Sequence, residues 1–320
     1  GICGWSMKYN SRGLRSELTF LGADMKPMMS DENISIVSYF YDEHANETGR
    51  VFRDSTGRHL TESNENIAGW NSKYDEFGNE TERTFFNKDS IKTLSISGYA
   101  SQQWEYDSHG NMLKNRFFDT DNRLVMVNGC AGNNNVYDEK GNLLENKPVG
   151  TDEKLAPGKL ISRYQYDKND NIIEFAVFHN NGDGATNSIH FHKYIKKYDS
   201  RNNPVEECYY NIHGKLTHYS DDKYAIVRKK YDERGNIVEL RYFDANEKPV
   251  CCNEGWAMSR YKYDAMGNIL QQCFFDVNDK PTDVNKMVPE GICRYDAQGR
   301  RTYIAACDGN GNLITNPATG

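Results

Sequence analysis

Long apolar runs, clustered basic residues and proline are all scarce in this sequence. No apolar stretch approaches the roughly 20 residues that a membrane-spanning helix needs. Pro accounts for 8 of the 320 residues, and the 39 Lys and Arg are scattered through a chain of formal net charge −7. Without a basic stripe, neither a nucleic-acid backbone nor an acidic membrane surface is an expected partner. We therefore expect no nucleic-acid partner and no membrane insertion within this segment.

Motifs that carry catalysis or bind metals are also missing. The chain has no Gly-x-Ser-x-Gly, no His-Glu-x-x-His and no phosphate loop. Its eight Cys form no Cys-x-x-Cys pair, which argues against a zinc ribbon. We expect these Cys to be small buried side chains, with scattered disulfides as the open alternative. The sequence predicts a protein that is not an enzyme and has no cofactor, although a glycosidase-like carboxylate pair is a spatial feature that sequence leaves open.

A tandem repeat of about 32 residues fills the chain. Successive copies of one Tyr lie 29 to 33 residues apart, and Asp follows that Tyr in nine of ten copies. Gly-Asn recurs four residues on, an aromatic pair recurs eleven residues on, and a Gly-x-Ala segment precedes the next Tyr by about eight residues. Repetition of this kind indicates a repeat architecture. The repeated Tyr residues are Tyr9, Tyr41, Tyr74, Tyr106, Tyr137, Tyr166, Tyr198, Tyr231, Tyr263 and Tyr295.

Each repeat predicts short strands separated by turns. Residues 258–263 alternate with period two, which is typical of a strand, and residues 237–243 are rich in β-branched and aromatic side chains. Asp, Gly and Asn in residues 232–236 have the chemistry of a tight turn, and residues 244–248 form a second turn signal. The fold class we predict is all-β, a tandem array of about ten units arranged as a β-solenoid or a spiralling β-sheet.

Repeat arrays grow as one body, because each unit contacts its neighbours. We therefore predict that residues 1–320 form a single continuous array, cut from a longer protein, with each Tyr and each aromatic pair facing the core between repeats. The fifth unit departs from the pattern, since its aromatic pair is absent and residues 146–159 contain two Pro and two Gly. We expect an inserted surface loop there, with Tyr137 and Tyr166 still stacked beneath it; a domain break is the alternative.

Three Trp residues are the candidate ligand-stacking residues: Trp5, Trp70 and Trp256. Trp5 and Trp70 share one repeat position, four residues before the Tyr. A flat aromatic ring on a strand can stack on a sugar ring, while packing in the core is the alternative.

Two further hypotheses concern metals. Asp232 and Asn236 could contribute oxygens to a calcium site, or cap their turn without metal. His190 and His192 would share a face of a strand and could bind zinc, or form a packed or surface pair. In both cases we favour the metal-free interpretation.

The repeated Tyr-Asp-x-x-Gly-Asn motif resembles that of the bacterial YD-repeat (RHS-like) proteins. Residues 106–111, 231–236 and 263–268 match it, and the resemblance extends over the whole chain. It implies strands that spiral into a large β-sheet, sometimes as a hollow shell around a toxin. This chain departs by its longer period and by a second half-motif, such as residues 274–280, which also looks like the aromatic hairpins of glucan- and choline-binding repeats.

The function we expect from this pattern is a non-catalytic structural or binding scaffold in a large bacterial surface or secreted protein. The expected partner is a protein or a surface glycan, self-association along the array is a further expectation, and the expected location is extracellular or at the cell surface. The alternatives are a glycan-binding repeat module and part of a shell that encloses a toxin.

Overall fold

The structure, a computed structural model, describes residues 1–60, 65–282, 290–307 and 313. The chain divides into two compact units, Gly1–Ile161 (unit 1) and Ser162–Gly320 (unit 2), and each is described by itself. The described residues are strands, turns and connecting segments without a helix, so the predicted all-β repeat fold is confirmed. Accordingly, the described part of the chain has no helix long and apolar enough to cross a membrane. Whether residues 1–320 form one continuous array stays a prediction.

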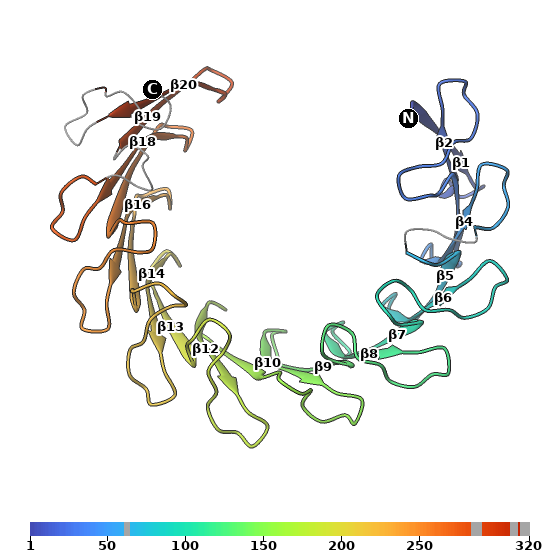
Figure 1. Cartoon of the computed structure of the whole chain (residues 1–320), viewed down its shortest axis with the longest axis horizontal. Helices are drawn as coiled ribbons and strands as arrows, with labels where there is room; N and C mark the ends of the chain where they lie inside the picture. The colour runs from blue at the N-terminus through green and yellow to red at the C-terminus, as the bar shows by residue number, and fades with distance from the viewer. Residues whose placement is uncertain (61–64, 283–289, 308–312, 314–320) are drawn as a thin grey trace. The chain divides into compact units, whose positions relative to one another are not determined.

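Within the described residues, twenty strands follow one another in chain order, two for each repeat (Figure 1). In unit 1 they are β1 (Gly4–Tyr9), β2 (Arg15–Leu21), β3 (Ile36–Tyr41), β4 (Glu47–Arg53), β5 (Gly69–Tyr74), β6 (Glu80–Phe86), β7 (Ser101–Tyr106), β8 (Met112–Phe118), β9 (Gly132–Tyr137) and β10 (Leu143–Val149). From the end of unit 1 onward they are β11 (Ile161–Tyr166), β12 (Ile172–Phe178), β13 (Lys193–Tyr198), β14 (Pro204–Tyr210), β15 (Ile226–Tyr231), β16 (Ile237–Phe243), β17 (Met258–Tyr263), β18 (Ile269–Phe275), β19 (Glu290–Tyr295) and β20 (Arg301–Cys307).

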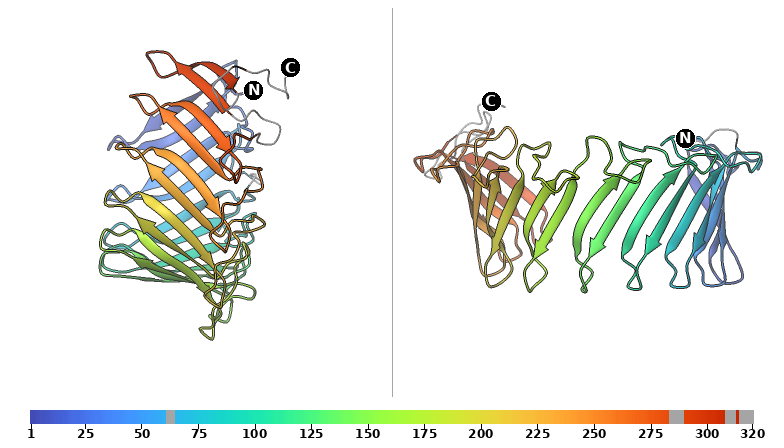
Figure 2. Two further views of the ribbon diagram at one scale, coloured as in Figure 1. Left: turned by 90° about the vertical axis from the view of Figure 1, so that its left-hand side faces the viewer. Right: turned by 90° about the horizontal axis from the view of Figure 1, so that it is seen from below.

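Each repeat is a β-hairpin that also pairs with its neighbours. β15 and β16 pair antiparallel from Ile226 opposite Phe243 to Tyr231 opposite Ile237, with a bulge next to the Tyr. β16 then pairs antiparallel with β17 of the following repeat. The short turns of successive hairpins lie along one edge in each unit, and the longer connections lie along the other (Figure 2). This pairing is that of a sheet, one of the two architectures that the repeat predicted.

Three turns of one kind shape each repeat. In the first, the amide of Asp232 donates to the carbonyl of Asn236 at 2.9 Å, and Asp244 and Lys248 form the same bond at 2.8 Å in the second. The sequence predicted these two. A third turn, in which the Cys252 amide donates to the Trp256 carbonyl at 2.9 Å, was not predicted.

The Ala of the Gly-x-Ala segment ties successive hairpins together. The Ala100 amide donates to the carbonyl of Phe118 in its own hairpin at 2.7 Å, and its carbonyl accepts from Phe85 of the preceding hairpin at 2.9 Å. Ala100 has no exposed surface, and the equivalent Ala68, Ala131, Ala225 and Ala257 are at most 1% exposed. The amide and the carbonyl of this Ala both bond neighbouring strands, so the strands lie close to it and leave room only for a small side chain.

The aromatic pair divides between the two faces of each sheet, because neighbouring strand residues point to opposite sides. Tyr242 contacts Trp256, whereas the guanidinium of Arg228 lies over Phe243 on the other face, 4.6 Å from the ring centre. The prediction that both members of each pair face one core was therefore wrong. The face that carries Tyr242 and its equivalents is called the ladder face below, and the other is called the ion-pair face.

The predicted insertion at residues 146–159 is also wrong. Residues 146–149 complete β10, which pairs with β9 as far as Val149 opposite Gly132. The next residues form the usual second turn, in which the Gly150 amide donates to the Lys154 carbonyl at 2.8 Å. A Pro fits at position 148 because the bond made there uses only its carbonyl, which accepts from the amide of Ala156. Pro lacks a backbone N–H, and this bond does not require one. The pair Pro148-Val149 thus stands where five other repeats have two aromatics, and Val149 is fully buried.

Candidate functional site

The repeated Tyr joins each repeat to the one before it. The Tyr231 hydroxyl donates to the backbone carbonyl of Pro204 at 3.0 Å, while its ring is half-buried. The equivalent Tyr263 does the same, so the prediction that these two residues occupy matching environments is confirmed. The same bond joins Tyr74 to Glu47, Tyr137 to Met112, Tyr198 to Ile172, Tyr263 to Ile237 and Tyr295 to Ile269, at 2.7–3.1 Å.

The Asp that follows nine of the ten repeated Tyr residues caps its own turn. Oδ1 of Asp75 accepts from the amides of Phe77 at 3.0 Å and Asn79 at 2.8 Å, and Oδ2 accepts from the Asn79 side-chain amide at 2.9 Å. The Asn79 side chain and these backbone amides lower the pKa of the Asp75 carboxyl, since they stabilise its charged form. Asp232 has the same three bonds. The donors of the turn bond both carboxylate oxygens, which fits the capping interpretation, and the absence of a calcium site here stays a prediction.

Gly-Asn serves contacts between successive turns as well as the turn itself. Gly235 has φ +85°, a conformation that residues with a side chain rarely adopt. A Cβ there would also lie 3.4 Å from the side-chain oxygen of Asn203 in the preceding turn. Gly110 lies in the same way against Asn79. The Asn of one turn therefore packs on the Gly of the next.

Aromatic rings form a continuous ladder on the ladder face of unit 2. Neighbouring ring centres lie 4.4–6.4 Å apart, within the range of stabilising aromatic contacts. Most of the rings come from the second strands or from the loop-side segments between hairpins, and Tyr164 comes from β11. In order, the members are Tyr164, Phe175, Phe191, Tyr209, Tyr219, Tyr224, Tyr242, Trp256 and Phe274.

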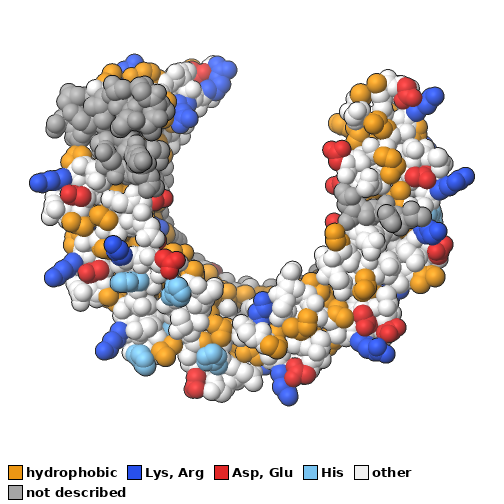
Figure 3. Space-filling model, viewed as in Figure 1, with side chains coloured by type: hydrophobic (Ala, Val, Ile, Leu, Met, Phe, Trp, Pro, Cys, Tyr) orange, Lys and Arg blue, Asp and Glu red, His pale blue; other side chains and the backbone are white. Residues whose placement is uncertain are grey.

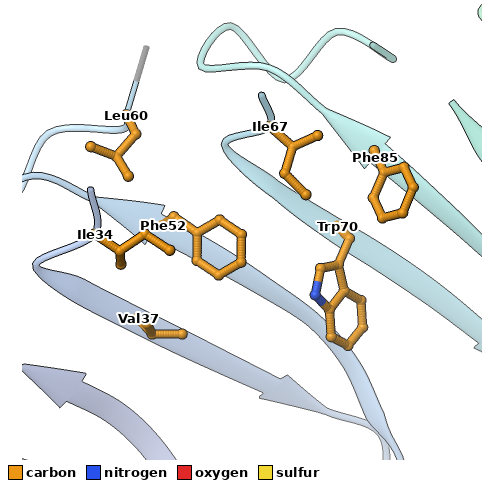
Figure 4. Packing of buried hydrophobic residues seen from close by; sticks show 7 residues of the cluster. All are labelled: Ile34, Val37, Phe52, Leu60, Ile67, Trp70 and Phe85. Atoms are coloured by element: carbon orange, nitrogen blue, oxygen red, sulfur yellow. The ribbon is translucent and has the colours of Figure 1, made fainter. Parts of the chain in front are cut away.

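In unit 1 the ladder face is only partly filled. Tyr99 links Phe85 and Phe117 with ring centres 5.3 and 4.9 Å apart. Nearer the beginning of the unit, the position of Tyr99 is taken by Ile34 and Ile67, which pack with Phe52 and neighbouring side chains in an apolar cluster (Figure 4).

A groove of about 460 Å³ lies on this part of unit 1. Apolar side chains from β2 to β4 and from the Ile34 loop make most of its lining, and three charged residues complete it. Arg50 is paired with Glu47 at 2.5 Å and lies over the ring of Tyr39, whereas Glu32 and Glu65 are exposed. The lining consists of Leu18, Phe20, Ile34, Val37, Tyr39, Phe52, Arg50, Glu32 and Glu65.

Paired charges cover the ion-pair face of unit 2. Glu206 pairs with Lys197 of its own hairpin at 2.7 Å and with Arg228 of the next hairpin at 2.6 Å. Glu239 repeats the arrangement with Lys230 and Arg260 at 2.9 Å each. On the face that Figure 3 shows, too, basic side chains lie beside acidic ones. The charges of this face mainly hold hairpins together.

The three Trp candidates lie in different surroundings. Trp5 is 64% exposed on β1, but Trp70 and Trp256 are only 8% and 7% exposed. Trp70 lies under Arg83, 4.3 Å away, and Trp256 packs between Tyr242 and Phe274. The structure does not bring the three together. Ligand stacking stays a prediction, and of the three rings Trp5 has the free surface that it needs.

The two His residues do not share a strand face. His190 has φ +67° and lies in the third turn of its repeat, where a left-handed conformation is required. His192 packs edge-on against Phe178 and bonds the Ala185 carbonyl at 3.0 Å. The packed or surface interpretation fits both residues. No group of three or more His, Cys, Asp or Glu could hold a metal ion within residues 1–60, 65–282, 290–307 and 313.

The cysteines described by the structure are free thiols. Cys208 is buried, Cys3 is exposed and the other five are half-buried, while the side chain of Cys307 lies outside the described residues. Burial raises the pKa of the Cys208 thiol to about 11, which keeps it protonated and unreactive at neutral pH. The expectation of small packed side chains is confirmed for Cys208, and the described thiols form no disulfide.

The groove residues were missed because they are ordinary individually. Ile34, Glu32 and Glu65 match no motif, and their proximity arises from the pairing of successive repeats. One sequence signal was available: the residue at the middle position of the Gly-x-Ala segment is aromatic in four repeats, as Tyr99, Phe191, Tyr224 and Trp256, and aliphatic in others, including Ile34 and Ile67.

Comparisons with known proteins place this chain near solved structures of low similarity. No family model matches the chain, and no curated protein matches it. The structure described as "Crystal Structure of TcdB2-TccC3-Cdc42" aligns with a TM-score of 0.47 at 14% identity, over 93% of this chain. A structure of the Photorhabdus luminescens Tc holotoxin pore aligns with a TM-score of 0.44 at 13% identity, over 92% of this chain. This chain spans 15% of the length of either matched chain, so the resemblance to YD-repeat proteins rests on the residue pattern.

Proposed function

We propose that this chain is a non-catalytic structural scaffold of a large bacterial surface or secreted protein, and that its repeated surface holds a protein partner. The YD pattern supports the bacterial and extracellular assignment. The structural assignment is supported by what the repeated polar groups do.

The observation that carries the proposal is the use of the Tyr and Asp side chains inside the sheets. The Tyr231 hydroxyl bonds the preceding repeat, and the Asp232 carboxylate bonds its own turn. Groups bonded in this way have a structural role in each repeat. They hold successive hairpins by the same hydrogen bonds, as a rigid scaffold requires.

Hydrogen exchange of the intact chain tests the proposal. We expect the strand amides of the interior hairpins, β3–β8 in unit 1 and β13–β18 in unit 2, to be protected to similar extents, because the same bonds hold each of them. An interior hairpin whose strand amides exchange about 100-fold faster than those of its neighbours would reveal a local opening element. That result would contradict a uniform scaffold and favour a hinge or a gated site.

A further inference from the structure

The groove on the ladder face of unit 1 exists because one residue is smaller than its equivalents. Ile34 occupies the position of Phe191 in the sixth repeat and of Tyr224 in the seventh. Those two rings are 3% and 9% exposed and fill the space between successive second strands. An Ile side chain lacks the reach of a ring, so a volume of about 460 Å³ remains open beside Ile34. This size is within the range of small-molecule sites.

The floor of the groove is apolar and preformed. Phe20, Val37 and Phe52 belong to three successive strands, β2, β3 and β4, whose pairing fixes their positions. Val37 and Phe52 are 6% and 9% exposed, so they are held by packing rather than by a ligand. A floor of this kind suits a flat or branched hydrocarbon group.

The mouth of the groove carries unpaired negative charge. Glu32 and Glu65 come from equivalent loops of two successive repeats, and both are exposed. Among the described residues, no Lys or Arg nitrogen lies within 4.0 Å of either carboxylate. The third charged residue, Arg50, is already paired with Glu47 and lies against the rings of Tyr39 and Trp70.

The geometry points to a binding site for a small organic amine, a ligand with an apolar body and one cationic nitrogen. Its hydrocarbon part would lie on Phe20, Val37 and Phe52, and its ammonium group would face Glu32 and Glu65. This site goes beyond the scaffold function, which does not require it. The site lies in unit 1, and in the described residues of unit 2 the rings of Phe191, Tyr224 and Trp256 fill the equivalent space.

Three probes with the same ring and different charge test this assignment: phenethylamine, 2-phenylethanol and phenylacetate. Saturation-transfer NMR on the intact chain should show saturable binding of the amine, weaker binding of the alcohol and none of the acid. Raising the salt concentration should weaken the amine and leave the alcohol unchanged, since salt screens exposed charges. Equal binding of the three probes, or no binding of the amine at millimolar concentration, would overturn the assignment.

Two variants locate the site. Ile34→Phe introduces the ring found at Phe191 and should abolish binding of the amine and the alcohol. The double variant Glu32→Gln/Glu65→Gln should weaken the amine by about tenfold and leave the alcohol unchanged, because two exposed ion pairs are lost.

Glu76→Gln is the matched control, since Glu76 is an exposed carboxylate of unit 1 in a first turn, on a connection that does not line the groove. Its affinity for each of the three probes should equal that of the original chain. The double variant changes only exposed side chains, so it still decides the question if Ile34→Phe does not fold. Unchanged amine binding in a folded Ile34→Phe or in the double variant would refute the site.

Discussion

At the scale of single residues, the most informative side chain is the repeated Tyr. The sequence predicted its position in all ten repeats but assigned it to ring stacking. The structure shows that its hydroxyl is the important group, since it reaches the backbone of the preceding repeat. Ring packing and hydroxyl bonding give the same spacing, so the pattern alone could not separate them.

Removing that hydroxyl tests its contribution. Tyr231→Phe should lower the free energy of unfolding by about 1 kcal/mol, the usual net value of one hydrogen bond. The matched control is Tyr9→Phe, because the Tyr9 ring is 60% exposed and its hydroxyl donates to the sulfur of Met7, two residues away, and not to a preceding repeat. Urea unfolding of both variants measures the difference. Equal losses for the two would show that the bond to Pro204 contributes nothing.

Removing a buried hydroxyl in unit 1 should have the opposite effect on stability. Ser35 stands where the Gly-x-Ala segment usually has Ala; it has no exposed surface, and its Oγ has no partner among the described residues. A buried polar group without a partner costs about 1–3 kcal/mol. Ser35→Ala, which restores the residue found at Ala68, should therefore raise the free energy of unfolding by about 1 kcal/mol. A lower stability would show that Ser35 has a partner.

At the scale of elements, the sequence predicted the two strands and two of the three turns of each repeat. It missed the third turn because its first residue varies among Ser30, Ser95, Asn187 and Cys252, and no constant Asp marks it. It also predicted a loop at residues 146–159, since aromatics were expected and Pro and Gly were found. Backbone pairing held the strand in place without aromatic side chains.

Limited proteolysis tests whether residues 146–159 form an ordinary strand and turn or a protruding loop. Lys154 and Lys215 occupy the same position in the second turn of their repeats, both are exposed, and each precedes a Leu that bridges back to the strand. Trypsin should cut after them at initial rates within about threefold of each other, because local opening controls cleavage. A much faster cut after Lys154 would restore the loop hypothesis.

The first turns should make stability depend on pH below about 4. Hydrogen bonds from the Asn side chains and from backbone amides lower the folded pKa of Asp75, Asp107 and Asp232 below the unfolded value of about 3.9. Their contribution is complete above that value and is lost as pH falls through the folded pKa. The Tm should therefore fall between pH 4 and pH 2.

The triple variant Asp75→Asn/Asp107→Asn/Asp232→Asn provides the comparison. It should melt at a lower temperature than the original chain at pH 7, and the two should converge at pH 2. A constant difference at every pH would mean that the charge of these carboxylates does not stabilise the turns.

At the scale of the whole molecule, the period predicted the count and order of the hairpins. For a division of the chain, the sequence offered a domain break at residues 146–159 as an alternative, and the observed division between Ile161 and Ser162 lies just beyond them, inside β11. The groove was hidden, because it depends on which side chains meet after pairing.

Deleting one whole repeat tests how modular the chain is. Without residues 226–257, Ala225 is followed by Met258, as Ala257 is in the original chain. Arg260 then reaches the place of Arg228 opposite Glu206. We expect a folded β protein by circular dichroism whose Tm lies within a few degrees of the original, since neighbour contacts are replaced in kind.

Deleting residues 226–241 is the matched control. This deletion removes β15 and most of β16 and leaves the remaining part of the repeat without its hairpin. It should lose cooperative unfolding. If both deletions unfold alike, the repeats are not interchangeable.

The bond from each Tyr hydroxyl to the preceding repeat also has a direction. Its acceptor lies 25 to 27 residues earlier in the chain, and the donor is the later residue in all six of these bonds. During synthesis from the N-terminus, the ribosome has therefore already delivered the carbonyl of Pro204 when Tyr231 emerges. Each nascent hairpin meets a finished edge that can template it, so assembly can proceed in step with translation and does not need to wait for the C-terminus.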